Sequence, residues 1–184
     1  MNIEITDKEK GSQTFNLELS PTIQDFLSTN GLASVFSLVS TVEKDDGASG
    51  YKYLVKDKDW KSHNGWAYIL VIEDSIVKIG MTEVTLESRF TSYQAGTEKA
   101  RLKGTCSVTN FYCSELIRKA LSKGAKVEIY ATKALESKTK VNILGEIIEV
   151  RNKIAYAYES RLLEVFEKTY GFKPILCNNT STKQ

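Results

Sequence analysis

The chain has 184 residues, of which 41% are hydrophobic and 26% are charged, enough for one globular domain with at most a small extension. Its 25 Lys and Arg residues nearly balance its 23 Asp and Glu residues, so composition alone does not indicate a nucleic-acid-binding protein. No apolar run approaches the ~18 residues of a membrane span, and the first residues lack the basic-then-apolar pattern of a secretion signal. We therefore expect a soluble, cytoplasmic protein with no membrane partner. The three cysteines lack C-x-x-C spacing and indicate neither a disulfide framework nor a zinc site.

Alternating apolar residues at the N-terminus predict a β-hairpin over residues 3–19. Ser20 and Pro21 have the residue types of a helix N-cap and first helical position, and apolar residues then repeat at helical spacing on both sides of Gly31. We therefore expect two short helices between Ser20 and Val42. Because neither contains Lys or Arg, we interpret them as a packing or dimerisation extension, or an arm that embraces DNA, rather than as a helix-turn-helix reader.

A polar stretch at residues 44–50 is the expected boundary between this N-terminal extension, residues 1–50, and a main domain, residues 51–184. The main domain contains two strong strand patterns separated by only two residues, the length of a hairpin turn. A basic loop follows the first helix of this domain. The patterns predict strands over residues 51–55, 66–73, 76–82 and 127–131. They predict helices that end near Gly96, Gly124 and Gly171. They also predict a β-ribbon over residues 141–150, bent at Gly145, and an extended segment at residues 174–177.

These elements predict a mixed α/β (α+β) fold with a central antiparallel sheet flanked by helices, an N-terminal helical extension and an inserted β-ribbon. Charge is distributed unevenly over them. Residues 96–140 hold 10 basic and 4 acidic side chains, a net charge of +6, whereas residues 1–65 hold 7 and 10. Such asymmetry is typical of a protein that docks on a polyanion, although a solvated basic face is the alternative. The basic side chains expected to contact DNA are Lys99, Arg101, Lys103, Lys138 and Lys140.

Five residues of the main domain have a distinctive order and spacing. Tyr68 lies in an A-Y-I tripeptide on the first hairpin strand, and Lys78 begins a K-I-G tripeptide on the second strand, 10 residues later. Arg89 follows Lys78 by 11 residues, Tyr93 comes one helical turn after it, and Glu159 lies on the last helix. This pattern resembles the GIY-YIG nuclease superfamily over roughly residues 65–179, and the lysine form of its second motif is closest to the compact type II restriction endonucleases.

The resemblance implies a metal-dependent endonuclease that hydrolyses DNA phosphodiester bonds, with Mg²⁺ or Mn²⁺ as cofactor. It implies a sequence-specific restriction enzyme that acts on double-stranded DNA as a homodimer, because one such site cuts one strand. A phage or mobile-element nuclease of low specificity is an alternative within the family. Outside enzymology, the alternatives are a nucleic-acid-binding domain that keeps the fold without cleaving, and a domain whose positive charge serves an acidic protein partner.

Phosphodiester hydrolysis needs an activated water, positive charge at the transition state and a proton for the leaving oxygen. On neighbouring strands Tyr68 and Lys78 can share a face, so either could activate the water. Arg89 offers a forked donor to the scissile phosphate, and Tyr93 adds a hydroxyl. By resemblance, Glu159 is the metal ligand, a hard oxygen donor that suits Mg²⁺. Each side chain also has a structural interpretation, as a core aromatic, an edge-strand lysine or a member of a helix ion pair.

Other positions carry less information. Met81 stands where some relatives have a histidine, so that histidine's role is not carried over. His63, the only histidine, is expected at the surface or in contact with DNA. Asn178 and Asn179 resemble an asparagine that supports the site in some relatives. The ribbon from Lys138 to Val150 is the expected base-reading element.

Overall fold

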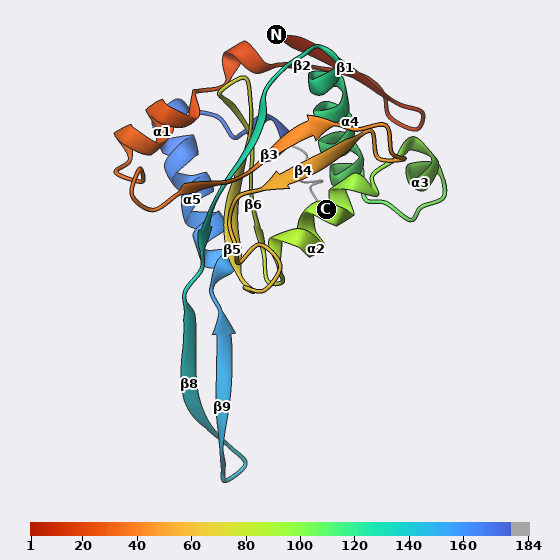
Figure 1. Ribbon diagram of the computed structural model, residues 1–184. Helices are drawn as coiled ribbons and strands as arrows, with labels where there is room; N and C mark the ends of the chain where they lie inside the picture. Colours follow the sequence, from red (N-terminus) through yellow and green to blue (C-terminus); the bar gives the residue numbers. More distant parts are fainter. Residues whose placement is uncertain (178–184) are drawn as a thin grey trace.

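The computed structural model describes the backbone of residues 1–177 and, except at residues 137 and 150–153, their side chains. Its centre is a five-stranded antiparallel sheet with the order β4-β3-β7-β5-β6, and helices cover both faces (Figure 1). The predicted mixed α/β class is confirmed. The strands are β3 (Ser37–Lys44), β4 (Tyr51–Val55), β5 (Trp66–Ile72), β6 (Ser75–Thr82) and β7 (Val127–Lys133).

The sheet separates two apolar cores. Strand β5 is buried at all seven positions, as expected for a strand covered on both sides. Tyr68 and Leu70 face α2 (Leu86–Gln94) and α4 (Val108–Ser122), whereas Ile69 and Val71 face α1 (Ile23–Thr29) and α5 (Ala155–Tyr170). Three layers result, with the central hairpin in the middle one.

The N-terminal hairpin is confirmed as β1 (Asn2–Asp7) and β2 (Gly11–Asn16). The first helix begins later than predicted, because Ser20 is used elsewhere: its hydroxyl donates to the Ile76 carbonyl. Thr22 caps α1 instead, accepting a hydrogen bond from the backbone N–H of Asp25. The N-terminal half of the predicted helix pair is therefore one helix of seven residues.

The second predicted helix is wrong, because residues 37–44 form β3. Leu32 to Val39 has helical apolar spacing, but the run from Ser37 onward is rich in Val, Ser and Thr, and pairing with β4 and β7 fixes it as a strand. Of the expected domain boundary at residues 44–50, Lys44 ends β3 and residues 45–50 form the turn between β3 and β4. A strand from residues 1–50 therefore lies inside the same sheet as the strands of residues 51–184, and the segment from Ser20 to Val42 is not a purely helical arm.

The later helices follow the prediction with two differences. A short helix, α3 (Glu98–Leu102), lies in the predicted basic loop, and α4 starts at Val108, well before its apolar repeat. Helix α5 ends at Gly171, whose φ of 80° is the left-handed C-cap conformation that favours glycine. In the part of the chain that the structure describes, no helix is both long and apolar enough to cross a membrane.

The inserted ribbon consists of β8 (Glu136–Ile143) and β9 (Glu146–Lys153) and is longer than predicted. It joins the end of β7 to the start of α5 and projects away from the three layers (Figure 1). The predicted bend at Gly145 is confirmed. The C-terminal segment Ile175–Cys177 is a 3-10 turn rather than an extended exit, and it packs on β6, where the Cys177 thiol donates to the Ile79 carbonyl at 3.2 Å.

Candidate active site

The β5–β6 hairpin brings Tyr68 and Lys78 to one face of the sheet. Tyr68 pairs with Gly80, and Lys78 pairs with Leu70, which lies two residues along the strand from Tyr68. Directly paired residues share a face of an antiparallel sheet, and alternate residues of a strand do too. Tyr68 and Lys78 therefore lie together beneath α2 and α4, as the sequence predicts.

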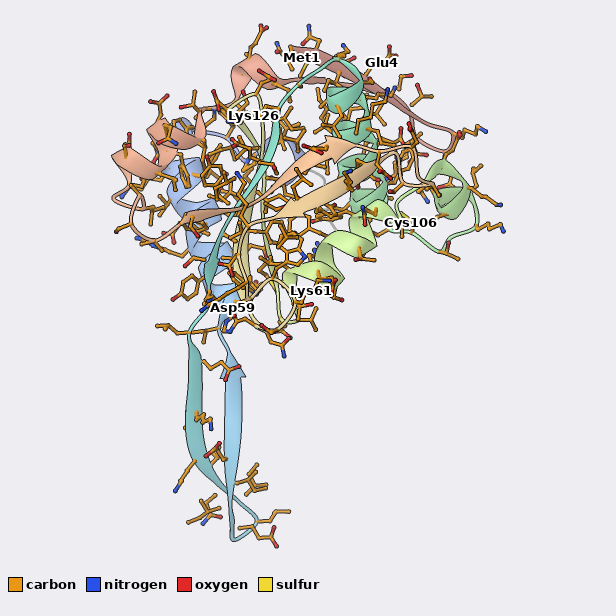
Figure 2. The ribbon with its side chains drawn as sticks, in the orientation of Figure 1. Met1, Glu4, Asp59, Lys61, Cys106 and Lys126 are labelled. Atoms are coloured by element: carbon orange, nitrogen blue, oxygen red, sulfur yellow. The ribbon has the colours of Figure 1, made fainter. Side chains whose placement is uncertain are left out.

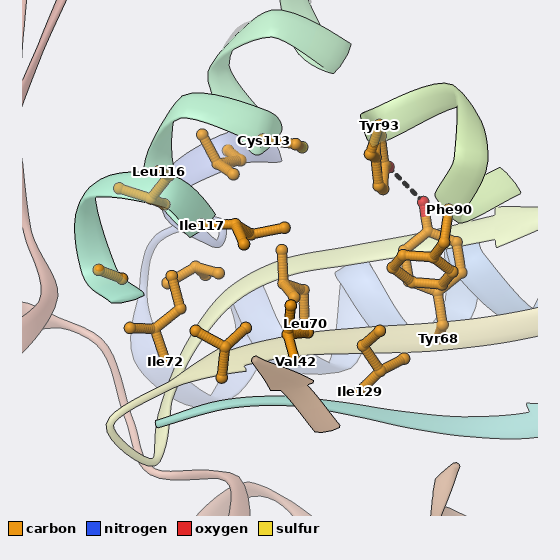
Figure 3. Packing of buried hydrophobic residues seen from close by; sticks show 14 of the residues in the cluster. Val42, Tyr68, Leu70, Ile72, Phe90, Tyr93, Cys113, Leu116, Ile117 and Ile129 are labelled. Carbon is orange, nitrogen blue, oxygen red and sulfur yellow. Dashed lines mark hydrogen bonds between the residues drawn. The ribbon is translucent and has the colours of Figure 1, made fainter. Parts of the chain in front are cut away.

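Helix α2 adds Arg89 and Tyr93 to this face. Thr85 caps the helix, and the two side chains lie one turn apart on its inner side. The Tyr68 and Tyr93 hydroxyl oxygens are 2.5 Å apart (Figure 3), and Arg89 Nε donates to the Tyr68 hydroxyl at 3.0 Å. The Arg89 guanidinium also lies over the Tyr93 ring, 4.7 Å from its centroid. Two phenols and one guanidinium thus form a connected cluster.

The surroundings of Lys78 and Arg89 keep both side chains protonated. Burial alone would lower the pKa of Lys78, which is 7% exposed, but Cys113, Tyr68 and Cys177 outweigh it, and its pKa is raised. Burial likewise opposes the charge of Arg89, and the two tyrosines reverse this effect and raise its pKa. Lys78 and Arg89 therefore carry positive charge at every physiological pH.

Tyr93 and Cys113 form the part of the cluster that is shielded from solvent. Both are fully buried, and burial raises the pKa of the Tyr93 phenol well above its usual range. Burial also raises the pKa of the Cys113 thiol to about 11, although Lys78, Arg89 and a hydrogen bond with Tyr93 pull in the opposite direction. Figure 3 shows Cys113 on α4 beside Tyr93. Tyr93 is therefore a neutral hydroxyl at physiological pH and not a proton acceptor.

Glu159 is half-buried on α5 and belongs to the same electrostatic environment. Burial raises the pKa of Glu159, although the charges of Lys78 and Arg89 act in the opposite direction. Glu164, on the same helix, is exposed and pairs with Arg161 at 2.8 Å. The structure therefore distinguishes Glu159 from its neighbour, which spacing along the helix could not do.

The donor set fits one kind of metal site. Within residues 1–177 there is no group of three or more His, Cys, Asp or Glu side chains that could hold an ion. A single carboxylate suits Mg²⁺, which keeps several waters and takes its remaining ligands from the phosphate oxygens of a substrate. It does not suit a structural zinc site, which needs four protein ligands. Glu159 is thus the residue that could hold a catalytic divalent ion.

The five basic residues expected to contact DNA lie in two places. Lys99 and Lys103 are exposed on α3, and Arg101 is tied into ion pairs with Asp7, at 3.2 Å, and with Glu9. Helix α3 lies beyond the C-terminal end of α2, beside the β1–β2 hairpin (Figure 1).

Lys138 and Lys140 are exposed on the ribbon, where Lys138 pairs with Glu149 at 3.2 Å. The ribbon leads directly into α5, the helix that carries Glu159. The ribbon lysines therefore lie on a segment that continues into α5, whereas the α3 cations lie beside the β1–β2 hairpin (Figure 1).

Some site residues were not found from the sequence. Cys113 and Cys177 influence the Lys78 charge, but their spacing carries no motif, and only the fold brings them to Lys78. His63 is not part of the cluster: its ring packs edge-on against Trp66 with centroids 5.2 Å apart. Asn178 and Asn179 lie outside the described residues.

Comparisons with known proteins identify the fold. No protein-family model matches the sequence, and no curated protein matches it. Restriction endonuclease HPY188I, solved in complex with product DNA, is similar over 89% of this chain and 90% of its own, with a TM-score of 0.61 and 24% identity. A mutant of bacteriophage T4 EndoII is similar over 80% of this chain and 95% of its own, with a TM-score of 0.53 and 20% identity. The chain therefore shares its fold with these two proteins.

Proposed function

We propose that this protein is a GIY-YIG endonuclease that hydrolyses phosphodiester bonds of double-stranded DNA, and that it acts as a type II restriction enzyme. The observation that carries the proposal is the cluster of Tyr68, Arg89 and Tyr93, with Lys78 on the same face of the sheet and Glu159, on α5, subject to the charges of Lys78 and Arg89. It combines a hydroxyl, two fixed cations and a carboxylate, which is the set that phosphodiester hydrolysis requires. The fold shared with a restriction endonuclease and a phage protein supports the same conclusion.

Arg89 and Lys78 bind the phosphate. Arg89 uses Nε for the Tyr68 hydroxyl, which leaves its two terminal nitrogens to donate to the non-bridging oxygens of the phosphate. Lys78 adds a second positive charge from a buried position, where charge interactions are stronger than in water. Both groups are held in place before substrate arrives, so they stabilise the additional negative charge of the transition state at little reorganisation cost.

Water activation falls to Tyr68. Lys78 and Arg89 stay protonated and act as cations rather than as proton acceptors. The Tyr68 hydroxyl is held at the centre of the cluster, with Arg89 Nε donating to it and Tyr93 within hydrogen-bond distance, and we assign the water to this hydroxyl. Glu159 would hold Mg²⁺ or Mn²⁺, which when bound supplies Lewis-acid stabilisation of charge at the phosphate.

The protein acts as a homodimer and recognises its DNA sequence through the ribbon. One cluster cuts one strand, so cutting both strands of a symmetric sequence calls for a homodimer whose two-fold axis matches that of the DNA. The ribbon is our candidate for base recognition, because a two-stranded ribbon fits the major groove. Its strands of eight residues, at about 3.3 Å per residue, reach about 26 Å.

Incubation of the purified protein with several plasmid DNAs and Mg²⁺ tests the proposal. Discrete fragments are expected, and their loss in EDTA would show metal dependence. A smear would indicate a non-specific nuclease, and strong retardation without product would indicate a binding protein that does not cleave. Sedimentation of the protein on a cleavable duplex tests assembly: two protomers per duplex are expected, and a strict one-to-one complex would rule out the dimer.

A further inference from the structure

The loop of residues 56–65, which joins β4 to β5, is attached to the catalytic helix α2. Trp60 is 3% exposed, and its ring stacks on Phe90 with centroids 5.3 Å apart. Phe90 in turn packs edge-on against Tyr68 at 5.1 Å. The Trp60 carbonyl also accepts the backbone N–H of Glu87 at 3.1 Å. Two ring contacts therefore connect this loop to the Tyr68 ring of the proposed site.

The loop lies at the ribbon end of the molecule. The ladders pair the end of β4 with the start of β3, the start of β3 with the end of β7, and the end of β7 with the start of β5. The loop therefore lies at the end of the sheet where β4 ends, β5 begins and the ribbon departs. Figure 2 shows Asp59 and Lys61 there, at the base of the ribbon.

The negative and positive side chains of this loop differ in the partners that they have within the protein. Asp59 pairs with Lys133, whereas Asp57 accepts the backbone N–H of Asp59 at 2.7 Å and keeps its negative charge. Lys56 and Lys58 are exposed, and neither forms an ion pair within residues 1–177. Together with Lys61, the loop therefore has three lysines against two aspartates, one of which is paired with Lys133, so its net charge is positive.

Lys61 has a side chain that is 70% exposed and lies 2.9 Å from Glu87 at the start of α2. An exposed pair of this kind contributes little to stability, so the lysine can exchange its partner for a phosphate at small cost. Lys61 is thus a third cation on the same surface, next to the helix of Arg89.

We infer that the loop of residues 56–65 is a docking surface for the DNA backbone, where Lys56, Lys58 and Lys61 bind phosphates beside the scissile one. This inference rests on the proposed function and specifies how its substrate is held. Phosphate contacts fix the register of a protein on a duplex without reading its sequence. Trp60 transmits that register to α2, so a backbone held on the loop is aligned with Arg89 and Tyr68. The cations of α3, although they lie in the most basic part of the sequence, have no such connection.

Salt-dependent binding distinguishes the two surfaces. Fluorescence anisotropy with a labelled duplex in EDTA, where cleavage does not interfere, gives the slope of log affinity against log salt for each variant. Each phosphate contact contributes about 0.9 to that slope. The double variant Lys56→Ala/Lys58→Ala should reduce the slope by about 2 and weaken binding equally on unrelated sequences. The matched control on α3, Lys99→Ala/Lys103→Ala, removes the same charge and should leave the slope unchanged.

The outcomes separate this inference from the proposed function. If the parental protein binds no duplex, the proposed function fails and the docking surface fails with it. If the parental protein binds and the α3 pair, not the loop pair, reduces the slope, the docking surface alone is overturned. Lys56→Arg/Lys58→Arg keeps the charge and should restore the parental slope; a failure to restore it would show that the loop acts through something other than phosphate binding.

Discussion

The Tyr68 hydroxyl occupies the space that a side chain at position 80 would need. The two residues are paired on β5 and β6, and a Cβ added to Gly80 would overlap both the hydroxyl and the ring of Tyr68. Glycine inside a strand is otherwise unfavourable, because it adds no packing and loses much entropy. Here it lets the phenol lie across the neighbouring strand and reach Tyr93.

Gly80→Ala should therefore disable the site. The new methyl group displaces the phenol from Arg89 and Tyr93, and a displacement of about 1 Å can lower a rate by about 10². Overpacking should also lower the free energy of unfolding by roughly 1–3 kcal/mol. Single-turnover cleavage and thermal unfolding measure the two effects. In a Tyr68→Ala background the same substitution should cost little stability, since the clash is gone; an undiminished cost would show that Gly80 acts on something other than Tyr68.

Glu159→Gln should abolish cleavage and leave duplex binding nearly intact, because the carboxylate acts on the transition state rather than on docking. Glu164→Gln is the matched control: Glu164 lies on the same helix, is exposed and pairs only with Arg161 among the contacts described. Cleavage rates in Mg²⁺ and duplex affinities in EDTA measure the two effects. Cleavage by Glu159→Gln at the parental rate would eliminate Glu159 as the metal ligand.

Tyr68→Phe removes one oxygen from the cluster and should lower the cleavage rate by about 10² or more, since it takes away the proton acceptor. The phenyl ring remains, so the packing against Phe90 and the unfolding temperature should change little. Tyr156→Phe, at a position that is 65% exposed on α5, provides the control. Cleavage by Tyr68→Phe at the parental rate would show that another group activates the water.

Arg89→Ala should lower the cleavage rate by about 10² or more through the loss of an electrostatic donor to the phosphate. Arg161→Ala, which removes a largely exposed guanidinium from α5, is the control and should leave the rate unchanged. Arg89→Lys tests the role of the fork, because a lysine cannot donate to Tyr68 and to the phosphate in the same geometry. Full activity in Arg89→Lys would mean that charge alone suffices at this position.

The sequence predicts best what depends on neighbouring residues. The hairpin of β5 and β6 needs two apolar runs and a two-residue turn, and the shared face of Tyr68 and Lys78 follows from strand pairing. Strand β3 was mispredicted because its apolar residues fit a helical period locally, whereas its strand state depends on pairing with β4, across the next turn, and with β7, at a distant position in the chain. Secondary structure that long-range pairing decides is not legible from local spacing.

The basic residues illustrate a second limit. Arg101 lies in the most positive segment of the chain, yet Asp7, 94 residues away, is its partner. Lys58 lies in a stretch of balanced charge, yet its neighbour Asp59 is paired with Lys133, from another part of the chain. Sequence counts charges, whereas docking depends on the charges that remain after internal pairs form, and only the fold determines those pairs.

The Asp7–Arg101 pair leads to a prediction about pH. The Asp7 side chain is 1% exposed and accepts hydrogen bonds from the backbone N–H groups of Glu9 and Lys10 as well as from Arg101. Burial would raise its pKa, but the Glu9 hydrogen bond and Arg101 outweigh burial, and the pKa is lowered. A carboxyl whose pKa is lower in the folded state stabilises the fold above its unfolded pKa of about 3.9 and loses that contribution as pH falls through the folded pKa.

Asp7→Asn should therefore destabilise the protein at pH 7 by roughly 1–3 kcal/mol, because it leaves Arg101 without its buried partner. The difference from the parental protein should shrink as the pH falls below about 4, where the parental carboxyl also becomes neutral. Urea unfolding between pH 3 and pH 7 measures this. Lys8→Ala, which breaks the exposed Lys8–Glu98 pair between the same hairpin and α3, should change stability by less than about 0.5 kcal/mol at either pH. A difference between Asp7→Asn and the parental protein that does not depend on pH would show that the Asp7 charge contributes nothing and that its shape alone is required.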